Sequence, residues 1–208
     1  MSSLRERILA TASERFRNEG FARVSVDEIA SSLGISKKTF YTVFASKEEL
    51  VEHLVSNKLA DVKAQIDEIM ARDEWFVAKF SALFAFLSSV PGGFGVPFLH
   101  DVERHLPHVW KRVESFRERR VMNTFAQLIE QGIQEGYIRP ELSTRLFLLA
   151  FTSAVQHIIQ PHVLAHESFS AQQAIGGLLE LFFKGALTDV GRKNLAALQR
   201  HNTSKRRL

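Results

Sequence analysis

The chain has 208 residues, of which 45% are apolar, and it has no cysteine and a formal net charge of +4. Its length permits one sizeable hydrophobic core, or a small module joined to a larger one. The lack of cysteine excludes disulfides, thiol nucleophiles and thiolate metal sites, and it is typical of proteins in a reducing compartment.

The positive charge is concentrated at the C-terminal end. Residues 189–208 contain six of the 27 Lys and Arg residues and one of the 23 Asp and Glu residues, which leaves 21 basic and 22 acidic residues before them. The net charge is therefore weak evidence for a nucleic-acid partner. We expect residues 189–208 to form a basic, flexible tail that adds at most a nonspecific attraction to phosphate.

The apolar pattern is helical nearly throughout and predicts an all-α fold. A first helix covers about residues 3–19 and ends at Gly20. A second helix begins at Ser25, where Glu28 completes a capping box, and a third begins at Ser36 after a short turn. Two short helices joined by a tight turn, with a helix before them, are typical of a helix-turn-helix.

We assign the helix-turn-helix to residues 1–46 and a larger helical regulatory and dimerisation domain to residues 47–188. A fourth helix with a second capping box is expected from Ser46 to about Met70. The sequence PGGFGVP predicts a break at residues 91–97.

Nothing in the sequence indicates export or membrane insertion. The N-terminal segment lacks the apolar core of a signal peptide. The apolar stretch 75–90 is interrupted by Lys79 and is shorter than the ~20 residues that a membrane span needs. We therefore expect a cytoplasmic protein.

Two further helices are expected at residues 143–165 and 171–187, and both are apolar on more than one face. Helices that close a bundle normally keep a solvated face. Burial against a second copy of the chain would explain the pattern, so we expect a homodimer formed through these last two helices.

Lysines stand at the starts of two of the expected helices. Lys37 and Lys38 follow the Ser36 cap, and Lys47 follows the Ser46 cap. Cations in a first helical turn are disfavoured by roughly 0.3 to 1 kcal/mol each. One interpretation is that all three are solvated surface lysines. The other is that a DNA phosphate backbone supplies their counter-charge.

The aromatic residues of the third helix separate by spacing. Phe40 and Phe44 are four residues apart and should face the core, whereas Tyr41 should face outward, where its hydroxyl could reach a phosphate. N-terminal residues of a recognition helix enter the major groove, and lysine pairs well with guanine acceptors. We therefore expect Lys37, Lys38 and Thr39 to approach base edges.

The segment from Arg7 to Leu50, with the pattern FxxxGFxxxSVDEIASSLGISKKTFYxxFxSKEEL, closely resembles the DNA-binding domain of the TetR family of bacterial transcriptional regulators. The remainder resembles that family in plan, as a larger helical domain that binds an inducer and dimerises through its last two helices. The resemblance implies DNA contacts at the matching positions, which are Ser25, Ser36, Lys37, Thr39, Tyr41 and Lys47.

Two positions depart from the family pattern. Lys38 stands where many members have glycine, so it adds a charged residue that could alter base preference. Val43 replaces a polar or aromatic residue that often touches the DNA backbone, so it is left out of the expected contacts.

A small-molecule pocket is the second expected site, because ligand pockets are mostly apolar with few polar anchors. Ordinary core packing is the alternative for each aromatic residue. Pro161 should loosen the helix near His157, since proline cannot donate to the carbonyl four residues earlier. The candidate residues for an apolar or aromatic ligand are Phe80, Phe84, Trp110, Phe125, Phe151, Gln156 and His157.

The sequence contains no GxSxG elbow and no P-loop, so we expect no enzymatic activity. Histidines at 100–108 and the pair His162 and His166 could suggest a metal, but no third ligand is set by spacing. We expect neither a metal nor a cofactor.

These features together predict a DNA-binding transcriptional regulator, most simply a repressor that binds a palindromic operator as a dimer and is released by a small ligand. The alternative is a DNA-binding scaffold or activator of the same fold that has no small-molecule inducer.

Overall fold

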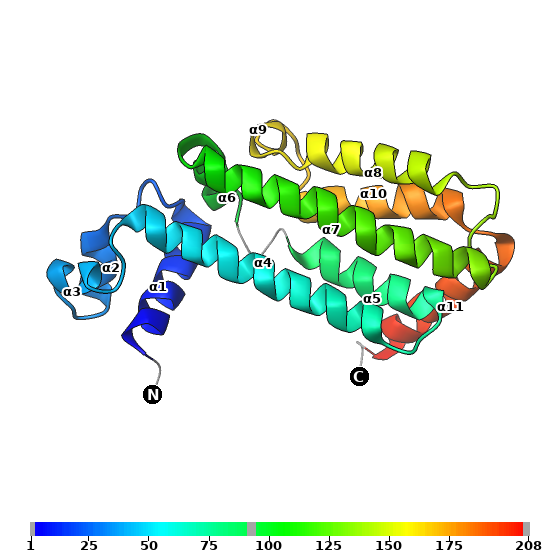
Figure 1. Cartoon of the computed structure of the whole chain (residues 1–208), viewed down its shortest axis with the longest axis horizontal. Helices are drawn as coiled ribbons and strands as arrows, with labels where there is room; N and C mark the ends of the chain where they lie inside the picture. Colours follow the sequence, from blue (N-terminus) through cyan, green and yellow to red (C-terminus); the bar gives the residue numbers. More distant parts are fainter. Residues whose placement is uncertain (1–2, 91–94, 206–208) are drawn as a thin grey trace. The chain divides into compact units, whose positions relative to one another are not determined.

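The computed structural model describes residues 3–90 and 95–205, and helices dominate both ranges (Figure 1). Within these ranges the only other regular pairing is an isolated antiparallel bridge between Ile138 and Leu187. The prediction of an all-α fold is therefore confirmed. None of the helices in the described part of the chain is long and apolar enough to cross a membrane.

The chain divides into two compact units. The first contains Met1–Val62 and Pro91–Ser115, and the second contains Lys63–Val90 and Phe116–Leu208. The first unit thus includes the whole segment 1–46 that we assigned to the helix-turn-helix, and it adds a segment from the middle of the chain.

Two of the three boundaries between the units fall inside long helices, and the third lies between Val90 and Pro91. Helix α4 (Lys47–Ala71) and helix α7 (Pro107–Gln134) each begin in the first unit and end in the second. Part of the predicted break at residues 91–97 lies outside the described residues.

Serine caps set the starts of the helices in the first unit. Helices α1 (Leu4–Glu19) and α2 (Val26–Ser32) follow Ser3 and Ser25, and each start has a complete capping box. Helix α3 (Lys37–Tyr41) follows Ser36. These side chains satisfy backbone N–H groups that have no partner inside the helix, so the predicted starts of these three helices are confirmed.

The predicted capping box at the start of α4 is only half present. Ser46 Oγ accepts a hydrogen bond from the backbone N–H of Glu49 at 3.0 Å. The Glu49 carboxylate, however, accepts from the backbone N–H of Ala45 at 2.6 Å. The side chain therefore reaches one residue further back than in a standard box.

Helix α6 (Val96–His105) and the start of α7 complete the core of the first unit. The ring of Phe16 in α1 stacks on Phe98 in α6 with centroids 6.2 Å apart, and Phe21 meets Phe98 edge-on at 6.3 Å. Other buried members of this core include Ile8, Ala12, Val24, Ile29, Phe40, Phe44, Leu50, Val102 and Trp110. The helix-turn-helix therefore shares one hydrophobic core with α6.

Two glycines allow α6 to approach α1 closely. Asp101 Oδ2 in α6 accepts a hydrogen bond of 2.8 Å from the backbone N–H of Ala22, in the loop between α1 and α2. Gly20 has φ +83°, and a Cβ there would lie 2.4 Å from the same oxygen. Gly95 has φ +74°, and its Cβ would lie 2.1 Å from the carbonyl oxygen of Arg17. A side chain at either position would strain the backbone and collide with its neighbour.

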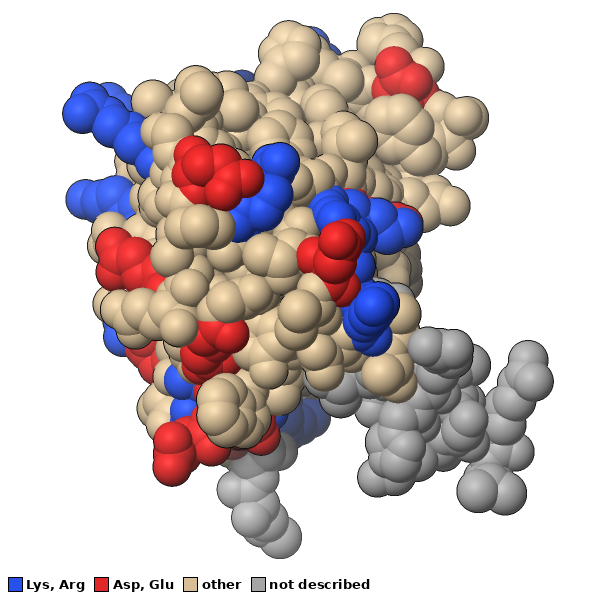
Figure 2. Space-filling view, turned by 90° about the vertical axis from the view of Figure 1, so that its right-hand side faces the viewer, with Lys and Arg blue, Asp and Glu red and all other residues tan. Residues whose placement is uncertain are grey.

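The second unit is a bundle that includes α5 (Phe76–Ser89), α8 (Thr144–Ile158), α10 (Ala171–Ala186) and α11 (Asp189–Lys205) with the later parts of α4 and α7. Helix α10 packs against α5 and α8, and α11 packs against α5 (Figure 1). One face of the molecule shows acidic and basic side chains intermingled beside a broad area that has neither (Figure 2).

Aromatic rings fill the interior of the second unit. Phe183 of α10 lies at the centre, with ring centroids 4.5 Å from Phe80, 5.1 Å from Phe147 and 5.3 Å from Phe125. Such ring pairs add to the free energy gained by burying the side chains.

Two expectations about the last helices need correction. The helix expected at residues 143–165 is divided, since α8 ends at Ile158 and a separate short helix, α9 (Pro161–Leu164), begins at the proline. The flexible tail expected at 189–208 is wrong for residues 189–205, which form α11. Leu195 is buried in this helix, so an apolar side chain anchors a segment whose composition had suggested a tail.

Candidate nucleic-acid interface

Helix α3 carries four of the seven candidate DNA contacts, Lys37, Lys38, Thr39 and Tyr41. It is held from inside by Phe40, which is fully buried, and Phe44 beyond its end is buried as well. At its start, Ser36 Oγ accepts from the backbone N–H of Thr39 at 3.0 Å and lies 2.8 Å from the Thr39 hydroxyl. The hydroxyls of Ser36 and Thr39 therefore already interact with each other before any DNA is bound.

Lys37 is not the uncompensated cation that its position suggested. Its Nζ lies 2.8 Å from Oδ2 of Asp27 in α2. The hydrogen bond from the Asp27 carboxylate, together with its charge, raises the pKa of Lys37. A protein carboxylate, rather than DNA alone, thus supplies a counter-charge for this lysine.

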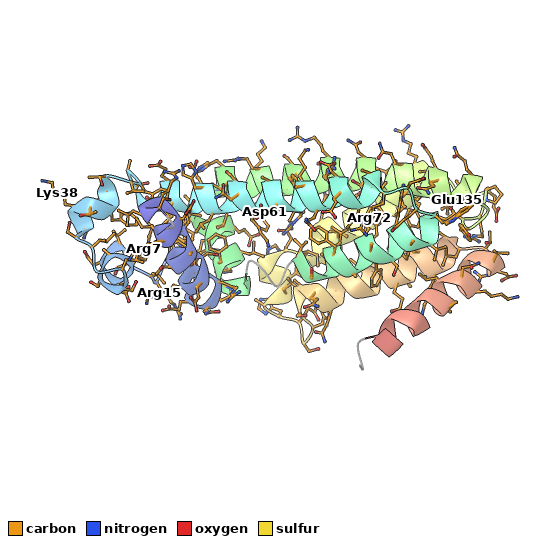
Figure 3. The ribbon with its side chains drawn as sticks, turned by 90° about the horizontal axis from the view of Figure 1, so that it is seen from below. Arg7, Arg15, Lys38, Asp61, Arg72 and Glu135 are labelled. Carbon is orange, nitrogen blue, oxygen red and sulfur yellow. The ribbon has the colours of Figure 1, made fainter. Side chains whose placement is uncertain are left out.

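Lys38 differs from Lys37 in its surroundings. Its side chain is exposed, and within residues 3–90 and 95–205 the structure shows no hydrogen bond or ion pair to it. Figure 3 shows it extending from α3 away from the other helices. Of the three lysines, it is the one whose ammonium group remains uncommitted.

Tyr41 faces solvent, as predicted from its spacing. Its side chain is 44% exposed, and its ring lies edge-on against the buried Phe40 with centroids 5.4 Å apart. This contact limits the directions that the phenol can take while leaving it accessible. The exposed Tyr41 side chain leaves room for a DNA phosphate to approach its hydroxyl group.

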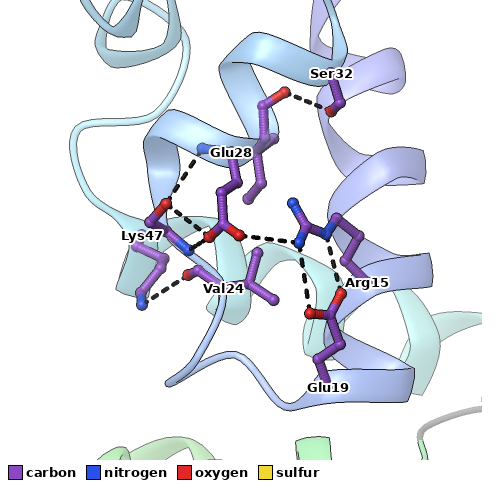
Figure 4. A network of polar contacts seen from close by, with 8 residues as sticks. Arg15, Glu19, Val24, Glu28, Ser32 and Lys47 are labelled. Carbon is purple, nitrogen blue, oxygen red and sulfur yellow. Dashed lines mark hydrogen bonds and ion pairs between the residues drawn. The ribbon is translucent and has the colours of Figure 1, made fainter.

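Lys47 has a structural role that the sequence did not reveal. Its Nζ donates hydrogen bonds to the carbonyl oxygens of Phe21 at 2.9 Å and Val24 at 3.1 Å, and it lies 5.6 Å from the centre of the Phe21 ring. Figure 4 shows it reaching toward the backbone at Val24. The start of α4 is thereby tied to the loop that leads into α2.

A polar network around Glu28 lies at the start of α2 (Figure 4), and the hydrogen bonds of Ser25 make it part of that network. The Glu28 carboxylate accepts from both the backbone N–H and the hydroxyl of Ser25 at 2.7 Å, and Arg15 pairs with Glu28 at 3.2 Å and with Glu19 at 3.0 Å. The backbone hydrogen bond from Ser25, then its hydroxyl and Arg15, lower the pKa of Glu28 to about 2.

The start of α2 carries two carboxylates: Asp27 pairs with Lys37 of α3, and Glu28 pairs with Arg15 of α1. Sequence reasoning treated Glu28 as a cap and did not assign a role to Asp27. It also missed Asp101, whose bond to Ala22 joins residues 79 positions apart. The helical spacing of α2 does place Asp27 on an outward face, where a charged partner could be expected. Which residue becomes that partner depends on the angle between α2 and α3.

The candidate ligand residues are divided between the two units. Phe80, Phe84, Phe125 and Phe151 lie in the second unit, where Phe125 and Phe151 have ring centroids 5.2 Å apart. Trp110 does not join them, because it is buried in the core of the first unit. That residue is better explained by packing against the helix-turn-helix core.

The two polar candidates lie at the end of α8. Gln156 is half-buried, and its carbonyl oxygen accepts from Gln160 Nε2 at 2.7 Å, while His157 is exposed. The predicted loosening near Pro161 is confirmed by the break between α8 and α9. Among the described residues, no three His, Asp or Glu side chains lie close enough together to hold a metal ion.

The sequence is similar to those of known transcriptional regulators. The sequence model described as "Bacterial regulatory proteins, tetR family" matches residues 8–54. The chain is 23% identical over 187 residues to the uncharacterised HTH-type transcriptional regulator YvaF of Bacillus subtilis, and the match covers 88% of this chain and 96% of YvaF. It is 27% identical over 154 residues to the HTH-type transcriptional repressor KstR2 of Mycobacterium tuberculosis, covering 70% and 74%.

Solved structures share the fold. The ketosteroid transcriptional regulator KstR2 of Mycobacterium tuberculosis aligns with a TM-score of 0.61 at 23% identity, over 91% of this chain and 97% of that one. A TetR-family transcriptional regulator from Marinobacter aquaeolei aligns with a TM-score of 0.71 at 17% identity, over 96% and 98%. The similarity thus extends well beyond the N-terminal residues that the family model matches.

Proposed function

Since this chain is a DNA-binding transcriptional regulator of the TetR family, we propose that it acts as a repressor that binds a palindromic operator as a homodimer. The observation that carries the proposal is α3. It is a short helix with a buried aromatic anchor at Phe40 and an outward row that contains Lys38 and Tyr41. A helix held in this way by a scaffold can enter a major groove.

The proposed DNA contacts fall into two groups. Lys37, Lys38 and Thr39 approach base edges, because they are the first residues of the recognition helix. Tyr41, Ser25 and Ser36 contact phosphates through their hydroxyl groups. Lys47 contributes mainly by holding the loop before α2, and its charge adds to the attraction for phosphate.

We propose that the dimer forms through α8 and α10. These helices lie against each other, and they leave Leu146 67%, Leu149 49% and Leu181 70% exposed. Large apolar side chains on neighbouring helices are typical of surfaces that associate. In a two-fold dimer the paired recognition helices would need a separation of about 34 to 36 Å, or a multiple of it, along the duplex.

The ligand we propose is small and apolar or aromatic, held among the rings of the second unit. Phe80, Phe84, Phe125 and Phe151 belong to that unit, and Gln156 is a half-buried polar residue near the end of α8. The relative KstR2 is described as a ketosteroid regulator, which is in keeping with an apolar ligand. To act as an inducer, the ligand must bind the state that cannot hold DNA more tightly than the other state.

A scaffold or activator without an inducer is the second candidate, because aromatic rings that contact one another also form an ordinary core. A cytoplasmic location and the lack of enzymatic activity are part of the proposal, and both are in keeping with relatives named as transcriptional regulators.

The direct test is selection of bound duplexes from a random library by the purified full-length chain, followed by sequencing. The expected product is an inverted repeat whose half-sites are about one helical turn apart. Enrichment of a single unrepeated site would contradict the dimeric operator, and no enrichment above a library passed over resin alone would contradict sequence-specific binding.

A further inference from the structure

We propose that Asp27 is a specificity-determining residue of the DNA-binding surface: its carboxylate engages Lys37, directs that side chain, and weakens binding to DNA of arbitrary sequence. The inference rests on the proposed role of α3 as the recognition helix. It concerns a residue that neither the family pattern nor the capping analysis had assigned to DNA binding.

The ion pair joins the two helices of the helix-turn-helix. Asp27 is the second residue of α2 and Lys37 is the first residue of α3, and their charged atoms lie 2.8 Å apart. The side chains are 63% and 53% exposed, so both remain accessible to a bound duplex. The Asp27 carboxylate therefore lies beside the first residue of the recognition helix, on the surface proposed to contact DNA.

Both ends of this pair are held in place by their own helices. The start of α2 is held by the Ser25–Glu28 capping box and by the buried side chains of Val26 and Ile29. The start of α3 is held by the Ser36 cap and the buried Phe40. The first turn of a helix also favours a carboxylate such as Asp27. The pair therefore has a stable geometry in spite of its exposure.

The pairing changes what Lys37 can do. An ammonium group has three N–H donors, and the bond to Asp27 occupies one of them and limits the directions of the other two. A lysine directed in this way can still donate to a base acceptor in the groove. Its contribution to nonspecific binding is reduced, because a DNA phosphate that approaches Lys37 is also repelled by the Asp27 carboxylate.

Lys38 provides the contrast. It is the next residue, and the described part of the chain shows no ion pair or hydrogen bond to its ammonium group. Nonspecific binding depends on how many phosphates are neutralised by free cations. Asp27 thus leaves Lys38 free to attract DNA of any sequence as well as to reach a base, and it restricts Lys37 to contacts that depend on sequence.

The experiment compares full-length wild type with Asp27→Asn, Lys37→Ala and the double variant. Fluorescence anisotropy is measured over a salt series on a duplex selected from the random library and on a scrambled duplex of the same length. Freeing one cation should steepen the salt dependence on the scrambled duplex by about 0.9 in the log–log slope, which corresponds to roughly fivefold tighter binding near 0.15 M salt. Binding to the selected duplex should change less, so the specificity ratio falls.

Two controls make the result interpretable. Asp61→Asn removes an equal charge from an exposed position of α4, away from the Lys37 pair, and should leave the slope on scrambled DNA unchanged. In the double variant, loss of Lys37 should abolish the gain caused by Asp27→Asn. If Asp27→Asn does not fold, the comparison of Lys37→Ala with Lys38→Ala serves instead, since only Lys38→Ala should weaken binding to scrambled DNA.

The outcomes separate this inference from the proposed function. Sequence-specific binding with an unchanged slope in Asp27→Asn, or an equal gain in Asp61→Asn, would overturn the role of Asp27 and leave the regulator intact. Equal losses in Lys37→Ala and Lys38→Ala on scrambled DNA would overturn it as well. Failure of the wild type to select any duplex would overturn both.

Discussion

The ammonium group of Lys47 lies 2.9 Å from the carbonyl oxygen of Phe21, so a residue expected to contact phosphate also holds the loop between α1 and α2. Lys47 Nζ also donates a hydrogen bond of 3.1 Å to the carbonyl oxygen of Val24, near the other end of that loop. A single side chain at the start of α4 thereby holds the loop that leads into α2. This changes what a substitution at Lys47 should do.

Lys47→Ala should lower the free energy of unfolding as well as the affinity for DNA. Hydrogen bonds from a charged donor contribute roughly 1.5 to 3 kcal/mol, and the half-exposed position favours the lower end of that range. Urea denaturation followed by circular dichroism measures the change. Lys38→Ala is the matched control, because its exposed ammonium group holds no part of the described fold and its loss should leave stability unaltered. Equal stability of the two variants would contradict the structural role.

Lys38→Ala should instead alter base preference. A lysine that donates to guanine acceptors contributes about 1 to 3 kcal/mol of discrimination, so binding to the selected operator should weaken by about 5- to 150-fold while one base position becomes tolerant. Repeating the library selection with the variant shows which position relaxes. Selection of the same sequence with the same stringency would show that Lys38 does not read a base.

Asp101→Ala should destabilise the first unit. It removes the charged acceptor of the exposed Ala22 N–H, and a hydrogen bond to a charged group contributes roughly 1.5 to 3 kcal/mol, with exposure favouring the lower end. Asp101→Asn keeps an acceptor oxygen and should restore most of the loss. The comparison is made by chemical denaturation, and equal losses in both variants would indicate that the charge of Asp101, rather than the hydrogen bond, is what matters.

Stability should fall in acid partly because of Glu28. Its pKa is about 2 in the folded chain, below the ordinary value of ~4.3 for glutamate in an unfolded chain. The folded state therefore binds this proton less readily, and the stabilisation is complete above about pH 4.3 and is lost as the pH falls toward 2. Glu28→Gln should be less stable than wild type at pH 7, and the difference should shrink toward pH 2.

Urea denaturation at several pH values measures this difference. Glu14→Gln is a suitable control, because Glu14 is an exposed glutamate of α1 for which the described structure shows no ion pair. A gap between Glu28→Gln and wild type that stays constant from pH 7 to pH 2 would contradict the assignment.

Leu181→Glu should dissociate the proposed dimer without unfolding the chain. The side chain is 70% exposed in the single chain, so a charge there is tolerated by the monomer but not by an apolar interface. Sedimentation velocity should show a dimer for wild type and a monomer for the variant at micromolar concentration. Val190→Glu, at 56% exposure on α11, tests whether the interface extends beyond α8 and α10.

Local features were predictable because their causes lie within a few residues. The starts of α1, α2, α3 and α10 depend on a serine and the backbone three residues later. The inward position of Phe40 and the outward position of Tyr41 follow from helical geometry alone.

The end of the chain shows where such reasoning stops. Composition favoured a flexible tail after residue 188, yet α11 forms there. Gly191 lies where a Cβ would be 2.3 Å from the carbonyl oxygen of Tyr137, so the helix start fits closely against the turn after α7. That contact joins residues 54 positions apart, and no local pattern marks it.

The sequence by itself determined the all-α class, the helix-turn-helix and the face of α3 that meets solvent, because capping and periodicity act over one or two turns of helix. Only the tertiary structure decided the partners of the charged groups. Lys37 pairs with Asp27 ten residues away, Lys47 bonds to carbonyls 26 and 23 residues away, and Trp110 joins the core of the first unit. These partners depend on the angles at which helices pack, which the whole core sets, so a lysine's position in the sequence could not tell whether DNA or the protein itself supplies its counter-charge.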